Sequence, residues 1–197
     1  MRTKAGDPLR AVMIELLPND YERLRRSFDE LRYGNLSPYP LVGLGSLSEF
    51  DSSRVPPGGA TLHCWDYVPY VRKDGRAWDE AKGEYAERML EHMRSFLTNL
   101  TPDNIVAYHC DSPVDMERTS PSFMHGDLHG IATSTYQSGS HRPTPELAQY
   151  TVPGIERFYL VGPFQHPGGG VFGAGRATAS RIFDDLKLDF DKTVARA

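Results

Sequence analysis

The sequence predicts an α+β fold in which short strands and amphipathic helices follow one another along the chain. Residues 79–97 carry apolar side chains at the three- and four-residue spacing of a helix. Residues 60–71 and 104–110 are rich in the aromatic and β-branched side chains that strands favour. Residues 157–161 form a continuous apolar run, which is typical of a strand buried on both faces.

Composition excludes several classes of protein. The 22 basic and 26 acidic residues give a net charge of -4, which favours binding neither to nucleic acid nor to an anionic membrane. The basic cluster at 23–26 lies in a mixed-charge helix, so we interpret it as a solvated face. No run approaches the roughly 20 apolar residues of a membrane span, and Met1 to Pro8 has no apolar stretch of signal-peptide type. We therefore expect a cytoplasmic protein with no integral membrane span.

The two cysteines, Cys64 and Cys110, lack the CxxC spacing of zinc sites and disulfide scaffolds. Both lie in strand-like runs, which predicts buried free thiols. A disulfide between them stays open at this level.

The first elements are marked by prolines and polar caps. Residues 9–17 form a short apolar run between prolines and predict a strand or a short helix. Asn19-Asp20 offers an N-cap for a helix over 21–32, and Gly34-Asn35 offers its end. The apolar face of this helix consists of Tyr21, Leu24, Phe28 and Leu31.

Two strands and the clearest helix follow. Residues 39–47 predict a strand with a bend, and the Pro-Pro-Gly-Gly turn at 55–59 separates it from the strand at 60–71, which Pro69 places at an edge. The apolar stripe of the helix at 79–97 predicts core packing against a sheet. Its members are Tyr85, Met89, Leu90, Met93, Phe96 and Leu97.

The middle of the chain is predicted to be less regular. After the strand at 104–110 we expect an acidic loop over 111–118. Residues 125–145 are rich in glycine, serine and proline and predict a long loop. Loops of this length in compact domains tend to be functional or disordered.

The last segment places a glycine-rich loop, 162–170, between the apolar run at 157–161 and a helix predicted over 171–186. Consecutive glycines let a ligand approach the backbone closely, and the start of a helix presents unpaired N–H groups with the positive end of its dipole. This arrangement suits a phosphate or the pyrimidine edge of a flavin. A tight glycine turn without a ligand is the alternative.

The run Phe158-Tyr159-Leu160-Val161-Gly162, followed by His166-Pro167-Gly168-Gly169-Gly170-Val171, resembles the C-terminal flavin motif of the phytoene desaturase family. The subgroup it most resembles is called pyridine nucleotide-disulfide oxidoreductase domain 2-like. Further blocks resemble the family in the same order along the chain. They are Arg23–Gly34, Ser46–Pro57, Tyr67–Tyr70 with Trp78–Glu80, Asp115–Arg118, His129-Gly130 and Arg142-Pro143.

The resemblance implies a two-domain FAD-dependent oxidoreductase that transfers hydride from an apolar substrate to the flavin, as a desaturase or dehydrogenase. Residues 1–150 would form part of an antiparallel-sheet substrate domain, and 151–197 would form the C-terminal strand, loop and helix of a split, Rossmann-like FAD domain. The residues implied to bind FAD are Gly162, Pro163, His166, Gly168, Gly169, Gly170, Val171 and Phe172. No catalytic residue is evident; His166 is a weak candidate, and closing the turn before Pro167 is its other role.

The chain departs from the family in one large respect. It has no GxGxxG fingerprint after an early strand, so the ADP half of FAD has no site here. Pro163 also occupies the place where many relatives carry an acidic residue. The chain resembles roughly the last two-fifths of a full-length member. We therefore expect it to be inactive alone, with an N-terminal half supplied as a separate chain, or a homo-oligomer, as its partner besides FAD.

Two alternatives remain. The first is a non-catalytic assembly subunit that completes the flavin site of a partner. The second is a metal-binding hydrolase that uses His125, Asp127 and His129, which alternate along an extended chain. A Ser-His-Asp hydrolase is excluded because the sequence has no GxSxG elbow.

Overall fold

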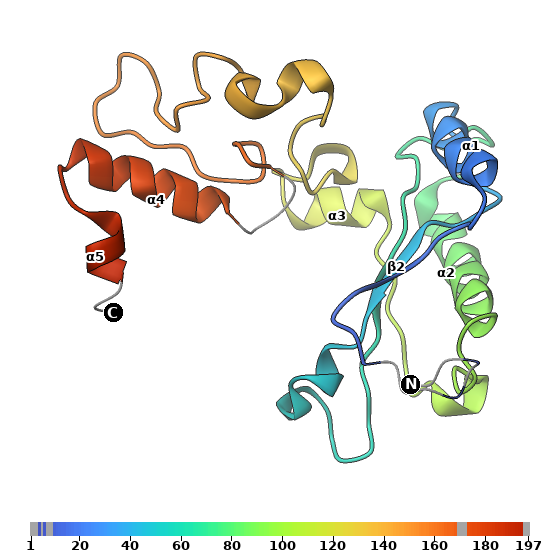
Figure 1. Cartoon of the computed structure of the whole chain (residues 1–197). Coiled ribbons are helices and arrows are strands. Elements are labelled where there is room, and N and C mark those ends of the chain that lie inside the picture. Colours follow the sequence, from blue (N-terminus) through green and yellow to red (C-terminus); the bar gives the residue numbers. More distant parts are fainter. Residues whose placement is uncertain (1–3, 5, 7–9, 169–172, 195–197) are drawn as a thin grey trace. The chain divides into compact units, whose positions relative to one another are not determined.

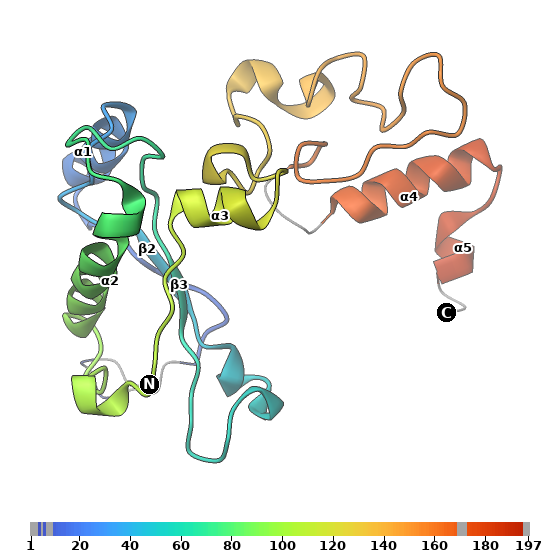
Figure 2. The ribbon, with the colours of Figure 1, turned by 180° about the vertical axis from the view of Figure 1, so that it is seen from behind.

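A computed structural model describes residues 4, 6, 10–168 and 173–194. The chain packs as two compact units, Met1–Asp115 and Met116–Ala197. Both are shown in Figure 1 and, from behind, in Figure 2. The predicted boundary between a substrate domain and an FAD-domain segment, after residue 150, stays a prediction.

The first unit is built on a three-stranded antiparallel sheet of order β1-β2-β3. Its strands are β1 (Ile14–Leu16), β2 (Val42–Gly45) and β3 (His63–Trp65). Ile14 lies opposite Leu44, and Gly43 lies opposite Trp65. The mixed composition of helices and antiparallel strands confirms the α+β prediction, and each strand lies inside a run that predicted one.

Helix α1 (Tyr21–Arg32) begins where its cap residue predicts. The Asp20 carboxylate accepts hydrogen bonds from the backbone N–H groups of Glu22 (2.8 Å) and Arg23 (3.2 Å). The apolar face of the helix is present but largely exposed, with Phe28 at 48%. Ser27 is the buried residue of α1, and its hydroxyl donates to the carbonyl of Tyr39.

Helix α2 (Trp78–Arg94) covers one face of this sheet (Figure 1). The predicted apolar stripe of α2 is confirmed as core, although Phe96, just beyond its end, remains 39% exposed. The core cluster comprises Leu16, Val42, Leu44, Trp78, Tyr85, Met89, Met93, Leu97 and Leu100.

Two predictions after α2 are wrong. Residues 105–110 run without a strand partner, so the strand predicted at 104–110 does not form. The acidic segment predicted as a loop contains α3 (Pro113–Thr119). Its start is a reciprocal cap, in which the N–H of Ser112 donates to the Asp115 carboxylate (3.0 Å) and the N–H of Asp115 donates to the Ser112 hydroxyl (3.2 Å).

The second unit contains a long irregular segment and two helices, α4 (Ala174–Asp185) and α5 (Phe190–Val194). The segment at 125–145 confirms the predicted loop, with short 3-10 turns along it. The helix predicted over 171–186 is confirmed from Ala174 onward. In the described part of the chain no helix is long and apolar enough to cross a membrane.

The strand predicted at 157–161 is wrong for this structure. Its only pairing among the described residues is an isolated bridge between Tyr159 and Thr151. Phe158 and Val161 are 51% and 58% exposed. Among the described residues the run has no neighbouring strands that would bury both of its faces. The assignment of 151–197 to a Rossmann-like FAD domain is not confirmed and stays a prediction.

Candidate functional site

The turn at 162–168 leads from the apolar run toward α4, and in both views of the chain α4 lies beside the irregular segment that precedes it (Figures 1 and 2). The backbone N–H of Gln165 donates to the carbonyl of Gly162 (3.1 Å). Gly162 has φ 155, and a Cβ there would lie 2.6 Å from the ring of Phe164. Glycine is therefore required at 162 by the close approach of that ring.

Side chains from outside the turn hold its backbone carbonyl groups. Tyr150 donates its hydroxyl hydrogen bond to the carbonyl of His166 (3.0 Å). Thr178, on the buried side of α4, donates to the carbonyl of Leu160 (2.9 Å), just before the turn. Arg142 donates to the carbonyl of Pro163 (3.0 Å). These bonds fix the path of the chain into the predicted flavin loop.

Arg142 also binds the loop that precedes it. Its Nη1 donates to the carbonyl of Ala132 (3.0 Å), and its Nη2 donates to those of His129 (3.2 Å) and Ile131 (3.4 Å). The residue is 3% exposed. Sequence reasoning placed Arg142 only as part of a family block, because arginine is rarely fully buried and nothing in its neighbourhood marks burial.

Gln165 is the most buried residue of the turn, with no exposed surface. Its Nε2 donates to the carbonyl of Leu147 (3.3 Å). Its Oε1 is buried and has no hydrogen-bond partner among the described residues. Sequence reasoning missed this residue too.

The start of α4 has no side-chain cap among the described residues. The N-cap residue is Gly173, with φ 87. The N–H groups of such a turn and the helix dipole favour an electron-rich or anionic group. Gly169, Gly170, Val171 and Phe172, the residues predicted to face the isoalloxazine, lie outside the described residues.

His166 is exposed, and its backbone carbonyl rather than its ring contributes the bond to Tyr150. A catalytic role for its ring stays a prediction. Gly168 is half-buried and has φ 78.

The described residues provide no ligand set for the alternative metal site at His125, Asp127 and His129. In the region of the candidate ligands, the Asp127 carboxylate accepts from the backbone N–H of His129 (2.7 Å), and the N–H of His125 donates to Glu117 (2.9 Å). Over the described ranges no group of three or more His, Cys, Asp or Glu side chains could hold a metal ion.

The cysteines are free and half-buried. Burial raises the pKa of both the Cys64 and the Cys110 thiol. The thiolate is the reactive form of cysteine, so burial disfavours the reactive form of both residues.

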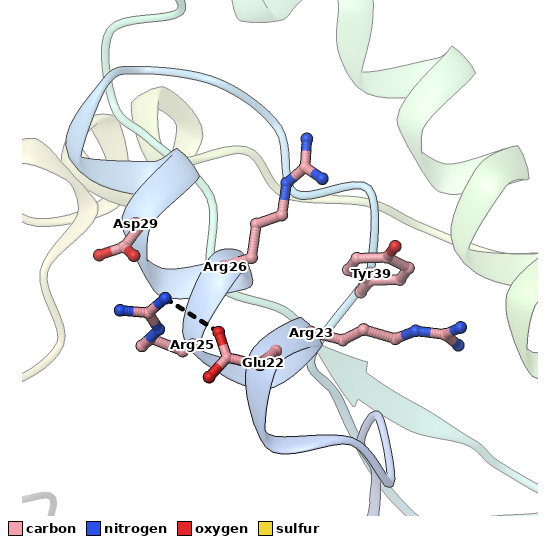
Figure 3. A pocket seen from close by; sticks show the side chains of 6 residues that line it. All are labelled: Glu22, Arg23, Arg25, Arg26, Asp29 and Tyr39. Atoms are coloured by element: carbon pink, nitrogen blue, oxygen red, sulfur yellow. Dashed lines mark hydrogen bonds and ion pairs between the residues drawn. The ribbon is translucent and has the colours of Figure 1, made fainter.

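The first unit carries a surface hollow of about 270 Å³ on α1 (Figure 3). Its lining alternates in charge: Arg25 pairs with Glu22 at 2.9 Å, and the guanidinium of Arg23 lies 5.4 Å from the centre of the Tyr39 ring. Exposed ion pairs of this kind contribute little to stability. They also leave little net charge in the hollow to attract a ligand. This arrangement agrees with the prediction that the basic cluster at 23–26 is a solvated helix face.

Comparisons with known proteins place the chain near oxidoreductases. No protein-family model matches it. It is 32% identical over 177 residues to pyridine nucleotide-disulfide oxidoreductase domain-containing protein 2 of Mus musculus, a match that covers 88% of the chain. It is 26% identical over 174 residues to one subunit of the limonene dehydrogenase of Castellaniella defragrans, covering 85% of the chain. It is 28% identical over 139 residues to a lycopene-forming phytoene desaturase of a Paracoccus species, covering 69%.

These matches confirm, at low identity, a relationship to oxidoreductases of the phytoene desaturase kind. The chain spans only about 30% of the mouse relative's length, 31% of the dehydrogenase subunit and 26% of the desaturase. That share is below the two-fifths that the resemblance implied.

Proposed function

We propose that this chain is the C-terminal, flavin-facing part of an FAD-dependent oxidoreductase that desaturates or dehydrogenates an apolar substrate. The observation that carries the proposal is the similarity, over 88% of the chain, to a protein named as an oxidoreductase. The names of the dehydrogenase subunit and the desaturase support the reaction class. The expected location is the cytoplasm.

Two features of the described residues support a flavin site at the start of α4. The uncapped first turn of α4 offers N–H donors, and a flavin's pyrimidine edge offers acceptors. Gly162 and Pro163 would lie along the ribityl chain, and Gly168 would begin the stretch that passes the ring. The unpartnered Oε1 of Gln165 is a buried acceptor in the same turn.

A bound flavin supplies the capacity to accept a hydride from a substrate C–H bond. The contribution of this chain is to orient the ring, through a turn held by Arg142, Tyr150 and Thr178. The ADP half of the cofactor needs a GxGxxG element that the sequence lacks. We place that element on an N-terminal half of the flavoprotein, because a second copy of this chain would lack it as well.

The test is a binding comparison on the purified chain. Riboflavin, FMN and FAD are each titrated up to millimolar concentration while visible absorbance and flavin fluorescence are followed. Because only the isoalloxazine side is present, we expect the three affinities to agree within about tenfold, with ADP failing to compete. The absence of any flavin perturbation, or efficient competition by ADP, would contradict the proposal.

A second candidate is a non-catalytic subunit that completes a partner's flavin site. The exposed apolar side chains of Phe158 and Val161 favour it, because such a surface marks an interaction site. One relative is itself named as a subunit. In both cases we expect the isolated chain to catalyse no flavin-dependent substrate oxidation. Turnover by the purified chain alone would exclude the non-catalytic subunit and would contradict the expectation that the flavin-facing part is inactive alone.

A further inference from the structure

Arg142 is a buried cation with an unusual set of partners. It is 3% exposed, and within the described residues no carboxylate pairs with it. All of its hydrogen bonds go to backbone carbonyl groups, in the loop at 129–132 and at Pro163. Burying a guanidinium is unfavourable unless its donors are satisfied. The planar fork of arginine can satisfy carbonyl groups from two segments at once, which an ammonium cannot do with fixed geometry.

Gly168 packs directly on the same guanidinium. A Cβ at this position would lie 2.7 Å from Nε and 3.2 Å from Cζ of Arg142. Nε is buried and has no hydrogen-bond partner among the residues that the structure describes. The side chain therefore contacts the turn at Pro163, where it donates a hydrogen bond, and at Gly168, where the absence of a side chain lets the backbone approach.

We propose that Arg142 is the positioning residue of the turn at 162–168, and that it fixes the approach of the chain to the start of α4, where the flavin ring would bind. The identity of the ligand in this inference rests on the proposed function. The contacts of Arg142 with the turn are independent of that function. Arg142 acts through the turn and touches no reacting atom.

The first test replaces the guanidinium and follows the turn by amide hydrogen exchange. We expect Arg142→Met to speed exchange of the amides at 162–168 by about tenfold or more, with smaller changes in 178–185 of α4. Arg142→Lys keeps the charge and loses the fork, so we expect nearly the same increase. Arg157→Met, at an exposed arginine of the same unit, is the control and should leave exchange unchanged.

The second test adds a methyl group and leaves Arg142 in place, so it holds even if Arg142→Met fails to fold. Gly168→Ala and Gly154→Ala carry the same backbone penalty, since their φ values are 78 and 79. Nothing lies within 4 Å of a Cβ at Gly154. We expect Gly168→Ala to speed exchange in the turn much more than Gly154→Ala does in its own loop. In an Arg142→Ala background the effect of Gly168→Ala should shrink, because alanine removes Cδ, Nε and Cζ, the atoms that the added Cβ would meet.

Riboflavin affinity gives the functional measurement. We expect Arg142→Met, Arg142→Lys and Gly168→Ala to weaken binding by about tenfold, and Arg157→Met and Gly154→Ala to leave it unchanged. Unchanged exchange in Arg142→Met, full rescue by lysine, or additive effects of Arg142→Ala and Gly168→Ala would overturn the inference. If the wild-type chain binds no flavin, the proposed function fails, while the exchange data still decide the role of Arg142.

Discussion

Replacing Gly43 with alanine tests the packing of the small sheet. Gly43 lies in β2, opposite Trp65 of β3, and the indole ring covers it. A Cβ at Gly43 would lie 2.3 Å from Cε2 and 2.4 Å from Cζ2 of that ring. The half-buried ring of Trp65 must therefore move away from β2. Overpacking of this kind costs about 1–3 kcal/mol, a large part of the roughly 5–15 kcal/mol that stabilises a domain.

Gly83 provides the matched control. It lies inside α2, and nothing lies within 4 Å of a Cβ added there. Glycine in a helix interior is about 1 kcal/mol less favourable than alanine. Gly83→Ala should therefore raise the free energy of unfolding of the first unit by up to about 1 kcal/mol, whereas Gly43→Ala lowers it.

Urea unfolding followed by tryptophan fluorescence measures both changes. The two tryptophans, Trp65 and Trp78, lie in the first unit, so their fluorescence reports on that unit. In a Trp65→Ala background, circular dichroism replaces tryptophan fluorescence as the measurement of unfolding. The clash is absent there, so the destabilisation caused by Gly43→Ala should fall by about 1 kcal/mol or more. The packing argument is refuted if Gly43→Ala matches wild type within about 0.5 kcal/mol, or if its cost is the same with and without the indole.

Two further predictions concern pH, and both use urea midpoints. Burial and the Asp66 carboxylate raise the pKa of Tyr85, so the neutral phenol favours folding. The stabilisation from the neutral phenol is complete below the unfolded pKa of about 10 and is lost as pH rises above that value. Tyr85→Phe should therefore flatten the decline in stability between about pH 9 and 11. An identical decline in the variant would contradict this prediction. The hydrogen bond from Lys82, at 2.8 Å, lowers the pKa of Asp115. This contribution is present above the unfolded pKa of about 3.9 and is lost as pH falls, so Asp115→Asn should lose less stability between about pH 6 and 3 than wild type. A steeper acid decline in Asp115→Asn would show that another carboxyl group dominates.

Local signals in the sequence predicted the elements that local chemistry determines. Asp20 fixed the start of α1 through its own carboxylate, and the apolar stripe of α2 identified the core. The strands were located within longer runs, but their ends were not. β3 spans only 63–65 because pairing with β2 sets its length, and no local signal encodes a pairing partner.

The misses have the same physical origin. The run at 104–110 has the composition of a strand, but in the described part of the chain it gains no ladder of hydrogen bonds. The short helix α3 depended on a reciprocal cap between Ser112 and Asp115, a pattern that is present in the sequence and was overlooked among acidic residues. Arg142 carried no local signal at all, because its role depends on carbonyl groups brought together by the tertiary fold.

The apolar run at 157–161 shows the largest difference between the predicted and the observed burial. Composition predicts that both faces of this run are buried, and the structure leaves Phe158 and Val161 more than half exposed. An apolar pattern predicts that a surface is buried, but it does not identify the segment that buries it. The relatives are about three times as long as the chain, judged from the 30% that it spans. If the GxGxxG half of the proposed flavoprotein supplies neighbouring strands, the run at 157–161 is covered only when the two halves associate. The same association would complete the flavin site next to the turn that Arg142 holds.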